Sequence, residues 1–364
     1  MHNANRLKIG FFGANCSSGR VVTKAPERWS GNWRDNLRLA RLADEAGIDF
    51  MLPLGRWKGY GGDTDYQGEA LETLTWASGL LAATKRVTVF GTVHAPLISP
   101  VFAAKQMVTA DQIGEGRFGL NIVVGWNEEE FEMFDVKQRD HEARYDYAQE
   151  WLDAIKLMWS EQSDVDFQGE FFKLKGVRAK PKPYGGARPL IMNAGASATG
   201  QAFAVKNCDA FFVQASRLSV DETAARVGAI RTDAARHGRA IDVYTVGLVI
   251  CRRTAKEAQD YFDYAVVENA DWAAMDRMMV RRNMSAKTLG LQDYEAKRRA
   301  AAVNMGGLPI IGDPDHVAAR LADYAKGGIA GVAISLINFL DDAPLFCQEV
   351  LPRLARMGLR EATP

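Results

Sequence analysis

The sequence has few cysteines and no excess of charge of either sign, and both shortages limit what the protein can be. Its four cysteines lie far apart and form neither a CxxC pair nor a disulfide framework, which favours a reducing compartment. They are Cys16, Cys208, Cys251 and Cys347. Lys plus Arg and Asp plus Glu both number 45, so no overall field exists to hold nucleic acid or an anionic membrane. The expected partner is a small molecule.

Long hydrophobic runs are also missing. No apolar stretch is long enough and free enough of charge to span a membrane, and the opening residues MHNANRLKIGFFGANC contain no signal-peptide core. We therefore expect a cytoplasmic protein. Hydrophobic residues still make up 47% and charged residues 25%, which is typical of a globular chain with a substantial core. We expect residues 1–364 to form one domain, because barrels often exceed the average domain size.

Several catalytic motifs have no counterpart in the sequence. The small-residue stretch NAGASATG (193–200) lacks the GxGxxG spacing and the Walker lysine, which disfavours a dinucleotide fold or a P-loop NTPase. No GxSxG elbow, cysteine nucleophile or metal-ligand spacing is visible, so no metal is expected. The lack of a convincing protein nucleophile indicates that a cofactor performs the difficult chemical step.

What the sequence does contain is an alternation of short β-branched apolar runs with longer amphipathic segments, typical of parallel strands joined by helices. The predicted strands are 7–13, 48–54, 86–93, 116–126, 188–195, 209–214, 243–250 and 330–337. The predicted helices are 33–46, 71–83, 100–112, 142–158, 198–207, 219–237 and 314–326. Eight strands favour a closed α/β barrel, the (β/α)₈ TIM barrel, over an open doubly wound sheet.

Two segments do not fit the regular alternation. Residues 164–174 alternate like a hairpin with its turn at Gln168–Gly169. A surplus rich in Met, Arg and Ala, at about residues 265–306, predicts an inserted, mainly helical segment near the C-terminal rim of the barrel. It could serve as a lid over an active site or as a dimer contact, and the two interpretations carry equal weight.

Barrel enzymes carry their sites at the C-terminal ends of the strands, which selects few positions. These are Arg56, Thr92, His94, Asn121, Trp126, Asn193 and Ser197. The small-residue stretch NAGASATG (193–200) turns from a strand into a helix and suits a phosphate at the helix N-terminus, although Ser197 could equally be a simple N-cap. Arg144 and Tyr145, at the start of another helix, could flank the same phosphate or lie on a solvated face.

Histidines and acidic residues give two further candidates. His94 is the only histidine at a predicted strand end, where it could act as an acid or base or merely pack. The remaining histidines look peripheral: His2, His141, His237 and His316. The acidic run Glu128 to Glu130 would ordinarily be a solvated helix start.

At these residues the sequence resembles the luciferase-like flavin-dependent monooxygenases. Within that superfamily it is most similar to pyrimidine monooxygenases that open the uracil ring, and more loosely to dimethyl sulfone and alkanesulfonate monooxygenases. The motifs are KGYGG (58–62), AAKQMVTADQIGEGRFGLNIVVGW (103–126), ARYDY (143–147), DFQGEFFKL (166–174), KPKP (180–183) and NAGASATGQAFA (193–204). They follow the expected order across roughly residues 6–214.

The resemblance implies an FMN site and a place for dioxygen. The implied FMN contacts are Gly55 and Arg56 near the ring edge, Asn121 and Glu130 on the flavin side, and Arg144, Tyr145 and Ser197 at the phosphate. Thr92 and Asn121 match the pair thought to hold oxygen beside flavin N5. Arg56 stands where the pyrimidine enzymes have Lys and His94 where they have a small residue, so we expect His94 in the substrate pocket, away from the flavin edge.

The resemblance also implies a reaction. A separate NAD(P)H-dependent flavin reductase supplies FMNH2, dioxygen reacts to form a flavin peroxide, and one oxygen atom enters a small organic substrate. An N5 adduct favours nucleophilic attack on an amide, ester, sulfone or halogenated carbon, and a C4a adduct is the alternative. Family members are commonly dimers or tetramers. The rival interpretations are an F420-dependent oxidoreductase and a non-catalytic flavin-binding barrel.

Overall fold

The computed structural model describes residues 1, 3–178, 180–215, 218–282, 284, 291–304 and 308–362. His2 lies outside the described residues. So do residues 283, 285–290, 305 and 306 of the predicted insertion.

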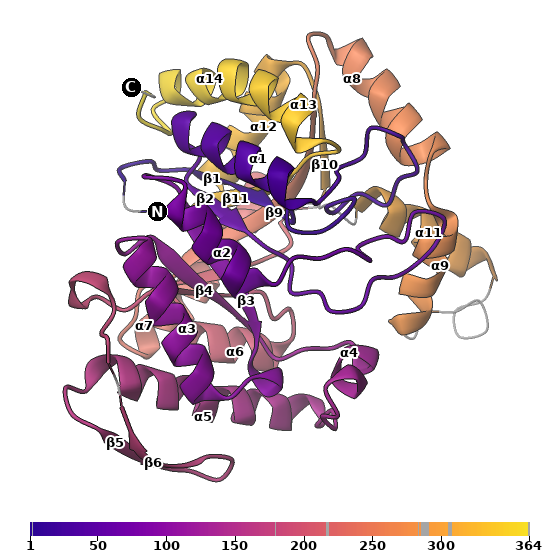
Figure 1. Cartoon of the computed structure of the whole chain (residues 1–364). Coiled ribbons are helices and arrows are strands. Elements are labelled where there is room, and N and C mark those ends of the chain that lie inside the picture. Colours follow the sequence, from indigo (N-terminus) through magenta and orange to yellow (C-terminus); the bar gives the residue numbers. More distant parts are fainter. Residues whose placement is uncertain are drawn as a thin grey trace.

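Eight parallel strands form a closed barrel, which confirms the predicted fold (Figure 1). The strands are β1 (Lys8–Phe12), β2 (Phe50–Leu52), β3 (Thr88–His94), β4 (Phe118–Val123), β7 (Leu190–Asn193), β8 (Ala210–Phe212), β9 (Asp242–Cys251) and β11 (Gly331–Ser335). The ring closes because β1 pairs with both β2 and β11, while β9 pairs with both β8 and β11. All eight strands correspond to predicted ones, with shorter bounds for most.

Helices surround the barrel and bury its outer face. They are α1 (Trp33–Glu45), α2 (Thr73–Ala82), α3 (Pro100–Ile113), α5 (His141–Ser160), α6 (Ala198–Asn207), α7 (Val220–Arg236), α12 (Pro314–Lys326), α13 (Phe339–Leu345) and α14 (Leu351–Arg356), with the short η1 (Ala95–Leu97), α4 (Glu128–Met133), η2 (Tyr184–Gly186) and η4 (Phe346–Val350). The largest apolar cluster lies between these helices and the strands. A second cluster, which includes Phe50, Phe90 and Tyr244, fills the barrel interior, so the barrel is a packed core.

Between β9 and α12 the chain leaves the regular pattern. It forms α8 (Ala255–Phe262), η3 (Asp263–Glu268), α9 (Trp272–Arg281), α11 (Leu291–Asn304) and β10 (Leu308–Gly312). Figure 1 shows α9 and α11 beside the long loops that follow β1 and β2. Met275 and Met278 of α9 pack there with Val22, Tyr60 and Tyr66. The helices of this segment therefore cover one side of the C-terminal rim.

Strand β10 is a feature that the sequence analysis missed. It pairs with β9 from Gly247 to Cys251, on the edge that β8 leaves free beyond Tyr244. The run LPIIG is short and contains Pro309, and proline argues against a strand because it cannot donate to the ladder. Pairing with the long strand β9 outweighs the local preference of proline against a strand.

The predicted hairpin exists, but its turn is wider than Gln168–Gly169. Strands β5 (Val165–Gln168) and β6 (Lys173–Val177) leave four residues between them. The Glu150 carboxylate on α5 accepts hydrogen bonds from the backbone N–H groups of Glu170, Phe171 and Phe172. A side chain distant in sequence thus shapes the turn, which no local pattern reveals.

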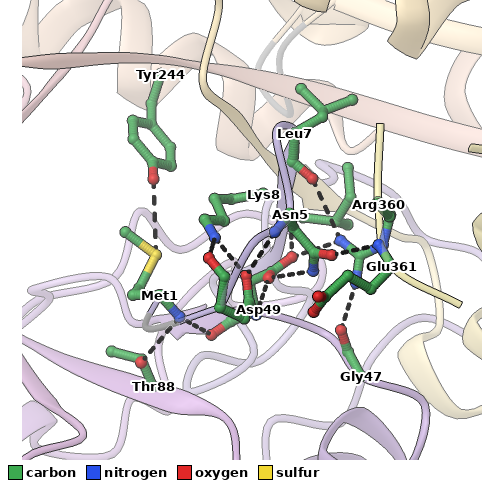
Figure 2. A network of polar contacts seen from close by, with 12 residues as sticks. Met1, Asn5, Leu7, Lys8, Gly47, Asp49, Thr88, Tyr244, Arg360 and Glu361 are labelled. Carbon is green, nitrogen blue, oxygen red and sulfur yellow. Dashed lines mark hydrogen bonds and ion pairs between the residues drawn. The ribbon is translucent and has the colours of Figure 1, made fainter. Parts of the chain in front are cut away.

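The N-terminal face of the barrel is held by a polar network (Figure 2). Asp49, just before β2, accepts from the backbone N–H of Ile9 at 2.8 Å and pairs with the Arg360 guanidinium. The Asn3 and Asn5 side-chain amides both donate to the other carboxylate oxygen of Asp49. The contacts of this face therefore serve to hold the barrel together. Among the described residues, no helix combines the length and apolar character needed to cross a membrane.

Candidate active site

Two adjacent strand ends bring Thr92 and Asn121 into contact. The two residues are register partners on β3 and β4, with buried side chains. The Asn121 Nδ2 donates to the Thr92 hydroxyl at 3.1 Å, and that hydroxyl donates to the Pro53 carbonyl at 2.6 Å. The Asn121 Oδ1 is buried, and no described residue donates a hydrogen bond to it. A buried acceptor of this kind is costly unless something donates to it.

The 53–58 loop lies directly against this pair. A Cβ built on Gly55 would stand 2.7 Å from the His94 ring and 3.0 Å from the Thr92 methyl group, so any larger residue would displace the strand-end side chains. Gly55 therefore sets how closely the loop approaches β3. Its place near the flavin ring edge stays a prediction.

Glu130 holds the same loop from the opposite side. Its Oε1 accepts from Arg56 Nη1 and from the backbone N–H of Trp57, both at 2.9 Å, and from that of Lys58 at 3.2 Å. The two charged side chains are almost completely buried. Glu130 is thus no solvated helix start, and it keeps the Arg56 guanidinium at the rim of the barrel.

His94 joins this cluster. Its Nε2 lies 4.0 Å from Glu130 Oε2, closer to the predicted flavin-edge residues than the sequence analysis expected. Burial lowers the pKa of His94 to about 4, and the nearby Glu130 carboxylate only partly offsets that effect. The imidazole is therefore neutral at neutral pH and can accept or donate one hydrogen bond without charge.

A second cavity, of about 240 Å³, gathers the three residues predicted at a phosphate. Arg144 and Tyr145 reach it from α5, and Ser197 from the start of α6. Ser197 is an N-cap whose hydroxyl accepts from the Gly200 N–H at 3.0 Å. Arg144 donates from Nη1 to the Gly125 carbonyl at 2.7 Å, while its buried Nε has no partner in the described part of the chain. The cavity therefore combines a cation with a helix N-terminus, which suits a phosphate.

Small residues allow the walls of this cavity to approach each other closely. A Cβ on Gly195 would stand 2.4 Å from the Tyr145 hydroxyl, so only glycine fits there. Burial raises the pKa of Tyr145 even though a hydrogen bond to Ser197 opposes the rise, so the phenol stays neutral and can donate.

These features fit an organic cofactor with a phosphate tail. The orphaned Asn121 Oδ1 offers an acceptor at the reacting end, and the orphaned Arg144 Nε offers a donor at the phosphate end. Among the described residues, no group of His, Cys, Asp and Glu could hold a metal ion.

Two residues of this region were missed by sequence reasoning. His141 looked peripheral, yet it lines the phosphate cavity one turn before Tyr145, with ring centroids 5.4 Å apart. Its position at the start of the helix that carries Arg144 was the available signal. Gln67 is buried and accepts from Arg56 Nε at 3.2 Å, but nothing in its local sequence marks it.

A parallel barrel with a polar strand-end pair and a phosphate-sized cavity at a helix N-terminus is the arrangement of a cofactor-dependent barrel enzyme. The chain belongs to the luciferase-like monooxygenase family, whose sequence model matches residues 7–331. It is a flavin-dependent monooxygenase of that family.

Individual relatives agree with this assignment along nearly the whole chain. The pyrimidine monooxygenase RutA of Acinetobacter baylyi is 28% identical, over 95% of this chain and 94% of its own length. The FMNH2-dependent dimethylsulfone monooxygenase of Pseudomonas putida is 29% identical, with the same coverage of both chains.

Solved structures support the fold. A riboflavin lyase, RcaE, with modified FMN and riboflavin superposes with a TM-score of 0.86 at 19% identity, covering 98% of this chain and 92% of its own. DmoA from Hyphomicrobium sulfonivorans gives 0.86 at 17% identity, covering 97% and 89%. An F420-dependent secondary alcohol dehydrogenase gives a lower score of 0.68 at 15% identity, covering 95% and 98%.

Proposed function

We propose that the protein is the oxygenase of a two-component system that uses FMNH2 and dioxygen to oxidise a small organic molecule. A separate NAD(P)H-dependent reductase supplies the reduced flavin. One oxygen atom enters the substrate, the other leaves as water, and FMN is released oxidised. A homo-oligomeric, cytoplasmic enzyme remains a prediction.

The phosphate cavity supports FMN as the cofactor. Arg144, Tyr145 and Ser197 line one cavity of about 240 Å³, where a guanidinium and a helix N-terminus can both contact a monophosphate. The small residues from Gly195 to Gly200 let backbone N–H groups approach that phosphate. Bound there, the cofactor extends toward β3 and β4 in this proposal, with Gly55, Arg56 and Glu130 at its ring.

The observation that carries the proposal is the Thr92 and Asn121 pair with its unsatisfied Oδ1. Reduced FMN supplies the electrons that activate dioxygen. The protein contributes fixed, uncharged polar groups beside that event, which stabilise developing charge without reorganisation. The resemblance of this pair to the pyrimidine enzymes favours attack on an electrophilic centre, as in an amide, ester, sulfone or halogenated carbon.

The deciding experiment is a screen of small organic compounds with enzymatically reduced FMN under ¹⁸O₂. We expect one product that contains a single labelled oxygen atom. Reduction of a substrate without incorporation of label, supported by reduced F420 in place of FMNH2, would overturn the proposal. Arg144→Ala should weaken FMN binding by about 1.5 to 3 kcal/mol, the range for hydrogen bonds to charged groups.

A further inference from the structure

A cavity of about 550 Å³ lies beside the C-terminal end of β3, between the N-terminal halves of α2 and α3. Its size is within the range of small-molecule sites. Leu74, Val93, Leu97 and Ile98 contribute apolar surface, and the wall nearest the barrel contains both Thr92 and His94. The cavity therefore adjoins the proposed oxygen site, on the side away from the phosphate cavity.

Large aromatic side chains stand at the mouth of this cavity. Trp57 and Phe134 meet edge to face with ring centroids 4.8 Å apart, and they are 42% and 37% exposed. Phe102, on α3, is 59% exposed at the same mouth. Clustered exposed apolar groups around a hollow commonly mark a ligand groove or a protein interface.

His94, a polar side chain inside the cavity, favours a ligand groove over a protein interface. The His94 side chain is only 9% exposed, and its Nε2 lies 4.0 Å from Glu130 Oε2, which is beyond hydrogen-bond distance. A contact with a second copy of the protein would cover the exposed aromatic rim. A small molecule that enters the hollow also reaches the imidazole and can exchange a hydrogen bond with it, which favours a ligand site.

The charges of the wall limit which molecule fits. Among the described lining residues there is no lysine or arginine, and Glu72 is the one carboxylate. Glu72 caps α2 by accepting from the N–H groups of Leu74 and Thr75. Burial keeps His94 neutral, with its pKa near 4. An anionic ligand would meet a carboxylate and no cation.

We propose that this cavity binds the substrate and selects a neutral, mainly apolar molecule with one hydrogen-bonding group directed at His94. Trp57, Phe134 and Phe102 enclose its apolar part at the mouth. This assignment rests on the proposed monooxygenase function, because it places the ligand against Thr92. Its test uses binding rather than turnover, so the two can fail separately.

The test compares two probes of similar shape, neutral 1-naphthol and anionic 1-naphthoate, by calorimetry at pH 7 on the full chain without flavin. We expect the neutral probe to bind at least about tenfold more tightly. Leu97→Trp should fill the cavity and weaken naphthol binding by at least tenfold. Ile113→Trp, at the far, exposed end of α3, is the matched control and should bind normally.

Two further variants test naphthol binding at other positions of the cavity. Phe102→Ala, at an exposed position, should weaken naphthol binding even if Leu97→Trp proves unstable. His94→Phe keeps an aromatic ring but loses the hydrogen bond, so naphthol affinity should fall about 2- to 10-fold. FMN affinity should be unchanged in Leu97→Trp.

Three outcomes would overturn the assignment. One is equal affinity for naphthol and naphthoate, and another is normal naphthol binding in Leu97→Trp. The third is a dimer in sedimentation experiments that Phe102→Ala dissociates, with no naphthol binding to either species, because the aromatic rim would then be an interface between copies. Labelled-oxygen incorporation into another substrate would leave the proposed function intact in each case.

Discussion

At the scale of single residues, the site depends on where hydrogen-bond donors and acceptors are already committed. The Thr92 proton is directed at the Pro53 carbonyl, and one Asn121 amide proton at Thr92. What remains for a ligand is the Asn121 carbonyl oxygen and the second amide proton. The pair therefore offers both an acceptor and a donor, through Asn121, while Thr92 fixes the orientation of that amide.

Thr92→Val tests this division of roles. Valine keeps the shape and removes the hydroxyl that orients Asn121, so FMNH2 should bind normally while product formation falls by about 10²-fold or more. Oxygen consumption would then yield hydrogen peroxide, measured with a peroxidase assay. Thr245→Val is the matched control, because that buried threonine on β9 also donates to a backbone carbonyl. Coupled product formation at the normal rate in Thr92→Val would exclude the role.

His94 gives a pH-dependent stability that can be measured without any ligand. Its pKa near 4 in the folded state lies below the unfolded value of about 6.5. As the pH falls, the imidazole is therefore protonated more readily in the unfolded chain than in the folded protein, which favours unfolding. The stabilisation is present above pH 6.5 and is lost as the pH falls toward 4, by about 2 kcal/mol between pH 7 and 5. Glu130 and Arg56 are the charged groups that face the ring.

Urea unfolding of wild type and His94→Gln at both pH values isolates this contribution. The variant lacks the titrating group, so its loss of stability between pH 7 and 5 should be smaller by about 2 kcal/mol. Equal losses in the two proteins would show that His94 titrates normally.

At the scale of elements, α9 is tied to the loop and helix that frame the site. The Arg281 guanidinium donates to both carboxylate oxygens of Glu129 on α4, at 3.0 and 2.7 Å, and to the Gly59 carbonyl at 2.9 Å. Lys58 Nζ lies 2.7 Å from the same carboxylate. Hydrogen bonds from Lys58 and Arg281 lower the pKa of Glu129. These contacts hold α9 against the frame of the site, while the lid and the dimer contact both stay predictions for the insertion.

Glu129→Gln should loosen α9. Since Glu129 is 38% exposed, solvent screening limits the loss to roughly 0.5 to 1 kcal/mol, a two- to fivefold faster amide exchange in residues 272–281. Hydrogen exchange with mass spectrometry measures this change, and added salt should reduce the difference. Glu128→Gln is the control, since Glu128 has no ion pair within the described residues. Unchanged exchange in Glu129→Gln would mean that apolar packing alone holds α9.

Elements with a strong local pattern were predictable, and elements decided by distant contacts were not. The helix Pro314–Lys326 matches its predicted bounds because Asp313 caps it, proline begins it and Gly327 follows. Strand β10 and the hairpin turn depend on β9 and Glu150, which lie far away in the sequence. In the site, Thr92 and Asn121 were predictable because barrel enzymes carry their sites at the C-terminal ends of the strands. The ion pair between Arg56 and Glu130 was not, because the two residues lie 74 positions apart in the sequence.

At the scale of the whole molecule, the two ends of the barrel have separate tasks. The C-terminal rim carries the candidate site, and the N-terminal face carries the Asp49 and Arg360 ion pair, with side chains 0% and 3% exposed. Arg360 also donates to the carbonyls of Leu7 and Gly47 (Figure 2). Buried ion pairs are costly to break one partner at a time, because the remaining charge loses its compensation.

Asp49→Asn should therefore destabilise the fold by about 3 to 5 kcal/mol in urea unfolding. FMN affinity of the folded protein should not change, because the pair lies at the opposite end of the barrel. Adding Arg360→Met to that variant removes the uncompensated charge and should recover much of the loss. A double variant as unstable as the single one would show that the hydrogen bonds to Ile9 and the asparagines matter more than the charge pair.

The pairing of β1 with β11 also has a consequence for synthesis in the cell. The barrel cannot close until residues 331–335 have been translated, although its first strand starts at Lys8. At typical elongation rates of about 5 to 20 residues per second, roughly 15 to 65 seconds separate these two strands. During that interval the nascent chain presents unpaired strand edges, which can pair with other chains. Protection by chaperones is therefore most needed late in translation, immediately before the last strand arrives.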